Sequence, residues 1–88
     1  MDVIDAIRAH SLESLYACLL QGQDPNHIDD YFCITPLHYA VANEFPEAVA
    51  LLLAAGANPN IKMFSGETPL MLAQLLDKQQ IVQLLQSI

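Results

Sequence analysis

The sequence predicts an all-α fold in which three helix-turn-helix units stack side by side as a solenoid. A hexapeptide, Thr-Pro-Leu-His-Tyr-Ala at 35–40, returns 33 positions later as Thr-Pro-Leu-Met-Leu-Ala at 68–73. A second phrase, which ends in Gly-x-x-Pro-Asn, occupies 18–26 and 52–60 at an offset of 34. Self-similarity at this period is typical of repeat architectures, in which neighbouring units bury a shared core.

The first unit, residues 1–34, is recognised by its alignment with the second. At an offset of 34 the two align without gaps, so that Gly22 falls on Gly56. The first unit begins with Met-Asp instead of Thr-Pro, and end units of a stack are expected to be atypical because one face meets water. We expect Ser11 to cap its second helix.

The second unit, residues 35–67, shows the helical pattern most clearly. Thr35 is a good helix N-cap, and Pro36 suits the first helical position, where its missing N–H costs nothing. We expect this helix to end near Asn43-Glu44 and a second helix to begin at the next proline. Gly56 would close the second helix in the left-handed conformation.

The third unit, residues 68–88, repeats this plan. Thr68-Pro69 predicts another helix start. Asp77, with Gln80 three positions later, is a plausible capping pair for the last helix. A helix that ends a stack turns a polar face outward, and the polar residues available for this are Gln79, Gln80, Gln83, Gln86 and Ser87.

Two connectors, 27–34 and 61–67, join the units. Each follows a Pro-Asn pair and precedes the next unit's Thr-Pro. Gly66 supplies a turn residue in the second connector. The first connector is one residue longer and has Cys33 where Gly66 would align, so we expect its turn to differ.

The charge balance favours a protein as the partner. The 88 residues suffice for one small domain and carry a formal net charge of −7, from ten acidic and three basic residues. The basic residues are scattered, so nucleic-acid phosphates have no cluster to bind, and an acidic membrane surface would repel the chain. We expect a neutral or basic protein partner; the alternative is that the acidity only aids solubility.

No pattern of catalytic or metal-binding residues is visible. Cys18 aligns with Leu52 and is interpreted as a small buried hydrophobe, and together with Cys33 it makes no disulfide framework. Zinc-ligand spacings, a phosphate loop and hydrolase motifs are absent from the sequence. We expect no cofactor, no metal and no enzymatic activity.

The chain shows no export or membrane signal. Its first residues lack the basic start and apolar stretch of a signal peptide. No apolar run approaches the roughly 18 residues that a membrane span needs. We therefore expect a cytoplasmic protein.

The phrases Thr-Pro-Leu-His-Tyr-Ala and Leu-Leu-Ala-Ala-Gly-Ala-Asn-Pro-Asn resemble the ankyrin repeat. The resemblance is near-complete in residues 35–67, strong in 68–88, and weaker but gap-free in 1–34. It implies antiparallel helix pairs stacked side by side, with the connectors projecting as hairpin-like fingers. It also implies one repeat domain over 1–88, with end units at 1–34 and 68–88.

In that family, partners bind at the fingertips and on the exposed face of each first helix. The resemblance therefore implies binding residues in the first connector at Ile28, Asp29, Asp30, Tyr31, Phe32 and Ile34. In the second connector they are Lys62, Met63, Phe64, Ser65 and Glu67. On the helices they are Arg8, Ala9, Ala42, Asn43, Leu75 and Leu76.

The fingertip residues allow two interpretations. Apolar side chains on projecting loops, such as Phe32 and Phe64, form a reasonable protein-binding hot spot; the alternative is that either ring folds back onto the stack. Asp29-Asp30 could pair with basic groups of a partner or satisfy hydrogen bonds of a turn.

The chain also departs from the family's pattern. The glycine that usually separates the two helices of a unit is replaced by His10, Glu44 and Asp77. The third unit has Met71 where the second has His38. The resemblance implies that His38 holds adjacent loops by hydrogen bonds and is not catalytic.

The function that we expect is non-catalytic protein recognition, as an inhibitor, an immunity-type protein or an adaptor. The step from fold to function rests on the resemblance. The competing interpretation is an assembly subunit that self-associates through its terminal helices, at Leu84 and Leu85. We expect a monomer rather than a homodimer, because the last helix can cap itself.

Overall fold

The computed structural model describes residues 1–28 and 32–87, and these residues form helices and connectors without a strand. In this part of the chain the helices are α1 (Val3–Arg8), α2 (Leu12–Leu20), α3 (Pro36–Ala42), α4 (Pro46–Ala54), α5 (Pro69–Leu75) and α6 (Gln79–Gln86). The prediction of an all-α fold is confirmed. In this part of the chain, no helix is both long and apolar enough to cross a membrane.

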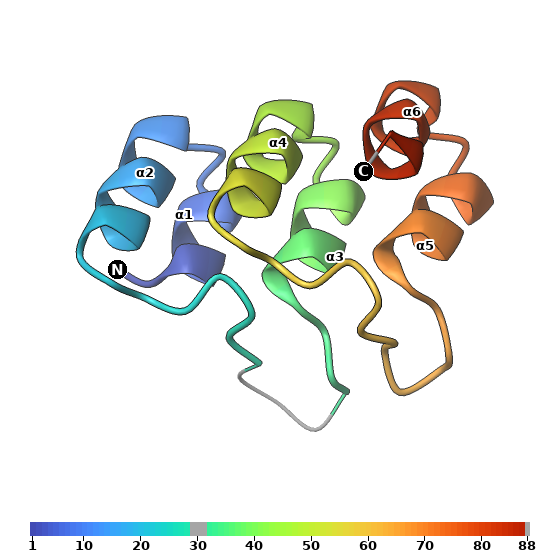
Figure 1. Cartoon of the computed structure of the whole chain (residues 1–88), viewed down its shortest axis with the longest axis horizontal. Helices are drawn as coiled ribbons and strands as arrows, with labels where there is room; N and C mark the ends of the chain where they lie inside the picture. The colour runs from blue at the N-terminus through green and yellow to red at the C-terminus, as the bar shows by residue number, and fades with distance from the viewer. Residues whose placement is uncertain (29–31, 88) are drawn as a thin grey trace.

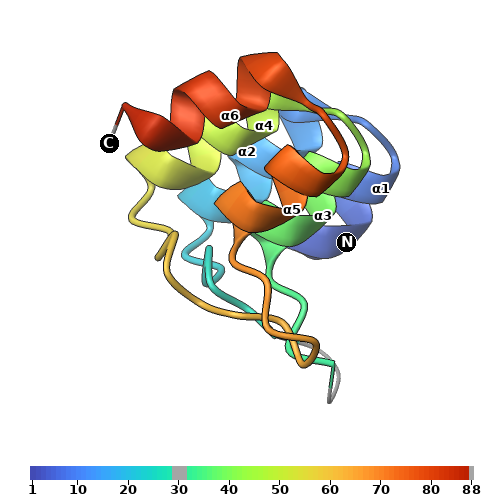
Figure 2. The same cartoon turned by 90° about the vertical axis from the view of Figure 1, so that its right-hand side faces the viewer.

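The helices form two layers (Figure 1). The inner layer contains α1, α3 and α5, and the outer layer contains α2, α4 and α6. Each inner helix packs against the outer helix that follows it, and α3 also packs against both α1 and α5. The connectors extend away from the outer layer, past the inner one (Figure 2).

The core lies between neighbouring units. Three alanines at equivalent positions of the inner helices, Ala6, Ala40 and Ala73, have no exposed surface. Small side chains there let the inner helices pack closely. Leu15 and Leu52, which belong to α2 and α4, are equally buried, so the outer helices close the same core.

Side-chain caps begin four of the described helices. As predicted, Thr35 Oγ1 accepts a hydrogen bond from the His38 N–H at 3.3 Å and caps α3. Thr68 caps α5, and Ser11 caps α2. Asp2 caps α1, a role that the sequence pattern did not indicate although Asp is among the strongest N-cap residues.

The predicted capping pair of the last helix, Asp77 with Gln80, is wrong. The N-cap of α6 is Lys78, and no side chain caps that helix. Asp77 instead adopts a left-handed conformation, with φ 57°. Its role is to end α5, because its N–H bonds to the Gln74 carbonyl at 3.2 Å and the Lys78 N–H bonds to the Ala73 carbonyl at 2.9 Å.

The same turn closes all three inner helices. His10 and Glu44 have φ values of 56° and 51° and make the hydrogen-bond pattern of a Schellman motif, as Asp77 does. Glycine is the usual residue here because it adopts this conformation without steric cost. The missing glycines that the sequence showed therefore leave three strained turns in an otherwise regular stack.

Cys33 shares the left-handed backbone conformation of its counterpart in the second connector. Cys33 adopts φ 60°, and Gly66 adopts φ 103°. The replacement of glycine therefore adds strain at this position. Residues 29–31 of the first connector lie outside the described residues, so the expected difference between the two turns stays a prediction. As predicted, Cys18 is buried.

Candidate functional site

The second finger is a hydrogen-bonded hairpin. The Met63 N–H donates to the Glu67 carbonyl at 2.8 Å, and the Gly66 N–H donates to the Met63 carbonyl at 2.8 Å. The Ser65 hydroxyl donates to the Glu67 carboxylate at 3.1 Å. These bonds hold the tip of the finger in one conformation.

Two hydrogen bonds tie the second finger and the residues before it to the first. The Phe64 N–H donates to the Phe32 carbonyl at 2.7 Å, so the two fingers meet near their tips. Nearer the helices, the Asn58 N–H donates to the Asn26 side-chain oxygen at 2.6 Å. The two fingers therefore present their side chains as one surface.

A buried histidine anchors the second finger to the helices. The Thr35 N–H donates to His38 Nδ1 at 3.2 Å, which leaves Nε2 protonated and able to donate to the Glu67 carbonyl at 2.8 Å. Burial lowers the pKa of His38, while the hydrogen bond to Glu67 opposes that change. This geometry fits the predicted loop-holding role of His38.

The finger surface presents large apolar side chains to solvent. Phe64 is 76% exposed, Phe32 is 47% exposed and Ile28 is 40% exposed. The interpretation that Phe64 folds back onto the stack is wrong. Ile34 and Met63 are half-buried, and the polar neighbours Lys62 and Ser65 are exposed.

Three of the predicted fingertip residues, Asp29, Asp30 and Tyr31, lie outside the described residues. The two interpretations offered for the aspartates therefore remain open. The described part of the first finger contributes Ile28, Phe32 and Ile34 to the predicted set.

The predicted residues on the inner helices form two groups. Arg8 donates to the Tyr39 hydroxyl at 3.1 Å, and its guanidinium lies 5.0 Å from the centroid of that ring. Asn43 donates to the Tyr39 carbonyl at 2.8 Å. Arg8 and Asn43 thus meet at Tyr39. Tyr39 follows His38 in the repeated hexapeptide but was not among the predicted binding residues.

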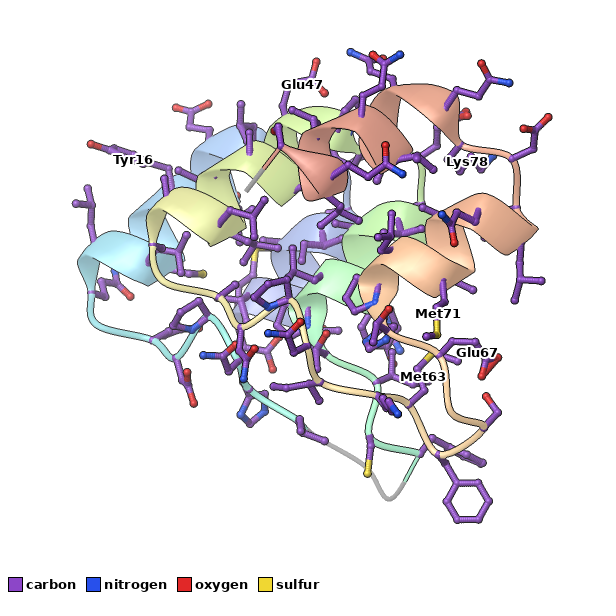
Figure 3. All side chains as sticks on the ribbon, turned by 45° about the vertical axis from the view of Figure 1, so that its right-hand side comes forward. Tyr16, Glu47, Met63, Glu67, Met71 and Lys78 are labelled. Atoms are coloured by element: carbon purple, nitrogen blue, oxygen red, sulfur yellow. The ribbon has the colours of Figure 1, made fainter. Side chains whose placement is uncertain are left out.

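The second group lies at the far end of the inner layer. Leu75 is 70% exposed and Leu76 is 44% exposed at the end of α5. Met71 is 45% exposed on the same helix, on the side of the second finger with Met63 and Glu67 (Figure 3). In the sequence, Met71 stands out only as a departure from the repeat, because the second unit has His38 at that position. His38 is buried and Met71 is exposed, so the change of residue type marks the change of surroundings.

The described residues of the fingers and inner helices offer apolar and hydrogen-bonding side chains. In residues 1–28 and 32–87, no three His, Cys, Asp or Glu side chains come together as a metal site. The buried His38 is committed to Thr35 and Glu67.

Comparison with known proteins identifies similar chains. A family model described as "Ankyrin repeats (3 copies)" matches residues 3–87. The fowlpox virus ankyrin repeat protein FPV216 is 35% identical over 71 residues, which are 81% of this chain and 24% of that protein.

Two further relatives come from eukaryotes. The fission yeast (Schizosaccharomyces pombe) glycerophosphocholine phosphodiesterase gde1 is 43% identical over 68 residues, 76% of this chain and 6% of that protein. Human NF-kappa-B inhibitor alpha is 51% identical over 39 residues, 44% of this chain and 12% of that protein. This chain spans no more than about a quarter of the length of these relatives.

Proposed function

The chain belongs to the ankyrin repeat family, and on that premise we propose that it is a non-catalytic module that binds a partner protein through its fingertips and the exposed face of its inner helices. Ankyrin repeats mediate protein–protein interaction. The finer proposal is that this chain acts by occupying its partner, as an inhibitor, an immunity-type protein or an adaptor. One relative is an inhibitor by name, which supports the first of these roles.

The exposure of Phe64 is the observation that carries the proposal. The Phe64 ring is 76% exposed, so it buries little apolar area in the folded chain and adds little to its stability. Aromatic side chains bury a large area for a small loss of side-chain freedom, so they are enriched at the energetic centres of interfaces. Phe32 and Ile28 on the neighbouring finger would extend the apolar centre of such an interface.

The rigidity of the fingers also supports a binding role. The tip is fixed by the hydrogen bonds of Met63 and Gly66, and the Phe64 N–H is bound to the Phe32 carbonyl. A loop that is already ordered loses less conformational entropy on binding than a free loop. The hydrogen bond from His38 to Glu67 extends this order from the helices to the finger.

Charge favours a partner with a basic surface. The chain carries a formal charge of −7, and attraction to a basic surface would raise the rate of encounter. As part of the same proposal, the protein works in the cytoplasm as a monomer, bound to neither nucleic acid nor membrane. Residues 1–34, 35–67 and 68–88 are its three repeats.

An assembly subunit is the second candidate. The terminal helix α6 presents little apolar surface for self-association, because Leu85 is 4% exposed and Leu84 is half-buried. The exposed Leu75 and Leu76 at the end of α5 are the observation that favours contact between copies. A change of molar mass in light scattering on Leu75→Ser, with no change for Phe64→Ala, would support assembly.

Affinity capture from a lysate of the source cells tests the recognition proposal. The bait proteins are the natural chain, Phe64→Ala, and Leu20→Ala as the matched control. Leu20 lies at the end of α2 in the outer layer and is 69% exposed, so its loss removes a large exposed apolar side chain from a different surface. Mass spectrometry with quantification identifies the retained proteins.

We expect at least one protein that is retained by the natural chain and by Leu20→Ala and is lost with Phe64→Ala. The same variants, measured by circular dichroism, must keep the helical signal. A set of retained proteins that is identical for the natural chain and Phe64→Ala would contradict a binding role for the fingertips.

A further inference from the structure

The outer layer carries an apolar groove that has no role in the function proposed above. It lies between α2 and α4, has a volume of about 470 Å³, and is lined by Leu12, Glu13, Tyr16, Glu47 and Leu51. Tyr16 and Glu47 project from the outer helices, away from Met63, Glu67 and Met71 on the finger side (Figure 3). The groove and the fingertips are therefore separate surfaces.

The repeated fold does not require these apolar side chains. Leu12 and Tyr16 are four positions apart on α2, where they are 39% and 53% exposed. Their counterparts are Pro46 and Ala50 in α4, and Gln79 and Gln83 in α6. The same framework is thus built twice without an aromatic ring at the position of Tyr16, so packing of the stack does not explain the ring.

Two carboxylates flank the groove without a counter-ion. Glu13 and Glu47 lie at equivalent positions in the first turns of α2 and α4, and both are exposed. Neither side chain has a hydrogen bond or an ion pair with the described part of the chain. The groove lining contains no lysine or arginine, so the rim is acidic on both helices.

We propose that the α2–α4 groove is a second docking surface, which takes a basic amphipathic helical segment of another protein. Apolar side chains of that segment, spaced four apart, would pack on Leu12, Tyr16 and Leu51, as helices do in apolar grooves. Lysine or arginine beside them would pair with Glu13 and Glu47.

A second copy of this chain fits the groove poorly. It would bring its own Glu13 and Glu47 against the same acidic rim, and its net charge of −7 adds repulsion over the whole surface. Charge therefore selects a basic partner over self-association at this surface.

Binding of a designed peptide tests the proposal. The probe is a fluorescein-labelled helical peptide with leucines at positions i and i+4 and lysines on both sides of them, followed by fluorescence anisotropy. A scrambled peptide of the same composition, with the leucines spread around the helix, keeps the charge but loses the apolar face. The protein variants are Tyr16→Ala, Glu47→Gln, Asp5→Asn and Phe64→Ala.

Two of these variants are matched controls. Asp5→Asn removes one charge from the first turn of α1, as Glu47→Gln does from α4, but lies in the inner layer. Phe64→Ala removes an exposed ring from the fingertips. These controls separate the groove from the bulk charge and from the surface proposed above.

We expect the designed peptide to bind to the natural chain. Tyr16→Ala should weaken this binding by about tenfold, as the loss of a central aromatic anchor does. Glu47→Gln weakens binding less and lowers its dependence on salt, while Asp5→Asn and Phe64→Ala bind as the natural chain does. Equal binding of the scrambled peptide, equal losses for Asp5→Asn and Glu47→Gln, or no binding of the designed peptide would overturn the groove as a docking surface.

Discussion

His38 in α3 donates a hydrogen bond from Nε2 to the backbone carbonyl of Glu67, at a distance of 2.8 Å. The other ring nitrogen, Nδ1, accepts a hydrogen bond from the Thr35 N–H. The side chain of Thr35 in turn caps α3. One neutral imidazole thus links the start of an inner helix to the end of the finger in the next connector. The link crosses 29 positions of sequence and positions the surface to which we assign function.

The protonation of His38 should make stability depend on pH. Its pKa is lowered below the ordinary value of 6.5, chiefly by burial, so the unfolded chain binds the proton more readily than the folded one. The resulting stability is complete above about pH 6.5 and is lost as the pH falls below that value. We expect the urea midpoint of the natural chain to fall between pH 7 and pH 5.

His38→Gln tests that assignment. The variant should be less stable at pH 7 by about 1–3 kcal/mol, since buried partners lose their hydrogen bonds. Its urea midpoint should fall less steeply than that of the natural chain between pH 7 and pH 5. His27→Gln, at an exposed position, serves as the control. Parallel pH profiles for the natural chain and His38→Gln would assign the titration to another group.

A glycine at the turn after α3 should stabilise the fold. Glu44 is left-handed with φ 51°, a conformation that costs a side-chain-bearing residue roughly 1–2 kcal/mol. Glu44→Gly removes that strain, and the added freedom of the unfolded chain offsets part of the gain. We expect a net increase of about 1 kcal/mol in the free energy of unfolding, measured by urea denaturation.

The salt bridge at this turn needs its own control. Glu44 pairs with Lys78 at 3.1 Å, but the carboxylate-bearing side chain is 68% exposed, so the pair contributes little. Glu44→Gln breaks the pair and keeps the backbone conformation, and we expect it to be near-neutral. A destabilised glycine variant beside a neutral glutamine variant would show that the turn stores no removable strain.

The local rules of the sequence predicted the helices well, and they predicted the left-handed Gly56, which has φ 96°, but they failed where a residue other than glycine had to be left-handed. Thr35 and Ser11 were identified as caps because the chemistry of a cap depends on neighbours three residues away. Asp77 was also predicted to be a cap, but it instead adopts the left-handed conformation that ends α5. The Schellman turn uses Asp77 itself, so this residue is not available as the N-cap of α6. The left-handed conformation of Cys33 was not predicted, because the sequence does not show that a non-glycine residue will accept the strain.

The surfaces were less predictable than the helices. The exposure of Phe64 and its backbone bond to Phe32 depend on how two connectors, far apart in sequence, meet in space. The groove between Tyr16 and Leu51 likewise joins two helices of different repeats. Neither relationship is encoded in a short motif, so the family resemblance supplied the fingertips and nothing indicated the groove.

The position of Leu52 predicts a large loss on truncation. Its side chain is fully buried between units, so Leu52→Ala should lower the free energy of unfolding by about 2–5 kcal/mol. Leu75→Ala removes the same atoms from a side chain that is 70% exposed, and it should change stability by no more than about 0.5 kcal/mol. A loss below that value for Leu52→Ala, in the same denaturant titration, would refute the register of the stack.

The hydrogen bond between the two fingers can be tested with two variants of Phe64, one that removes only the ring and one that also removes the N–H. Phe64→Ala removes the ring but keeps the N–H that donates to the Phe32 carbonyl, whereas Phe64→Pro removes both. We expect amide hydrogen exchange in both fingers to quicken in the proline variant and to stay near natural rates in the alanine variant, because only the former releases the joint. Amides of the buried inner helix α3 serve as the internal reference and should be unchanged in both. Equal exchange in the two variants would mean that the bond between Phe64 and Phe32 does not order the fingers. The pre-organisation would then come from the hydrogen bonds within the second finger and from the His38 anchor.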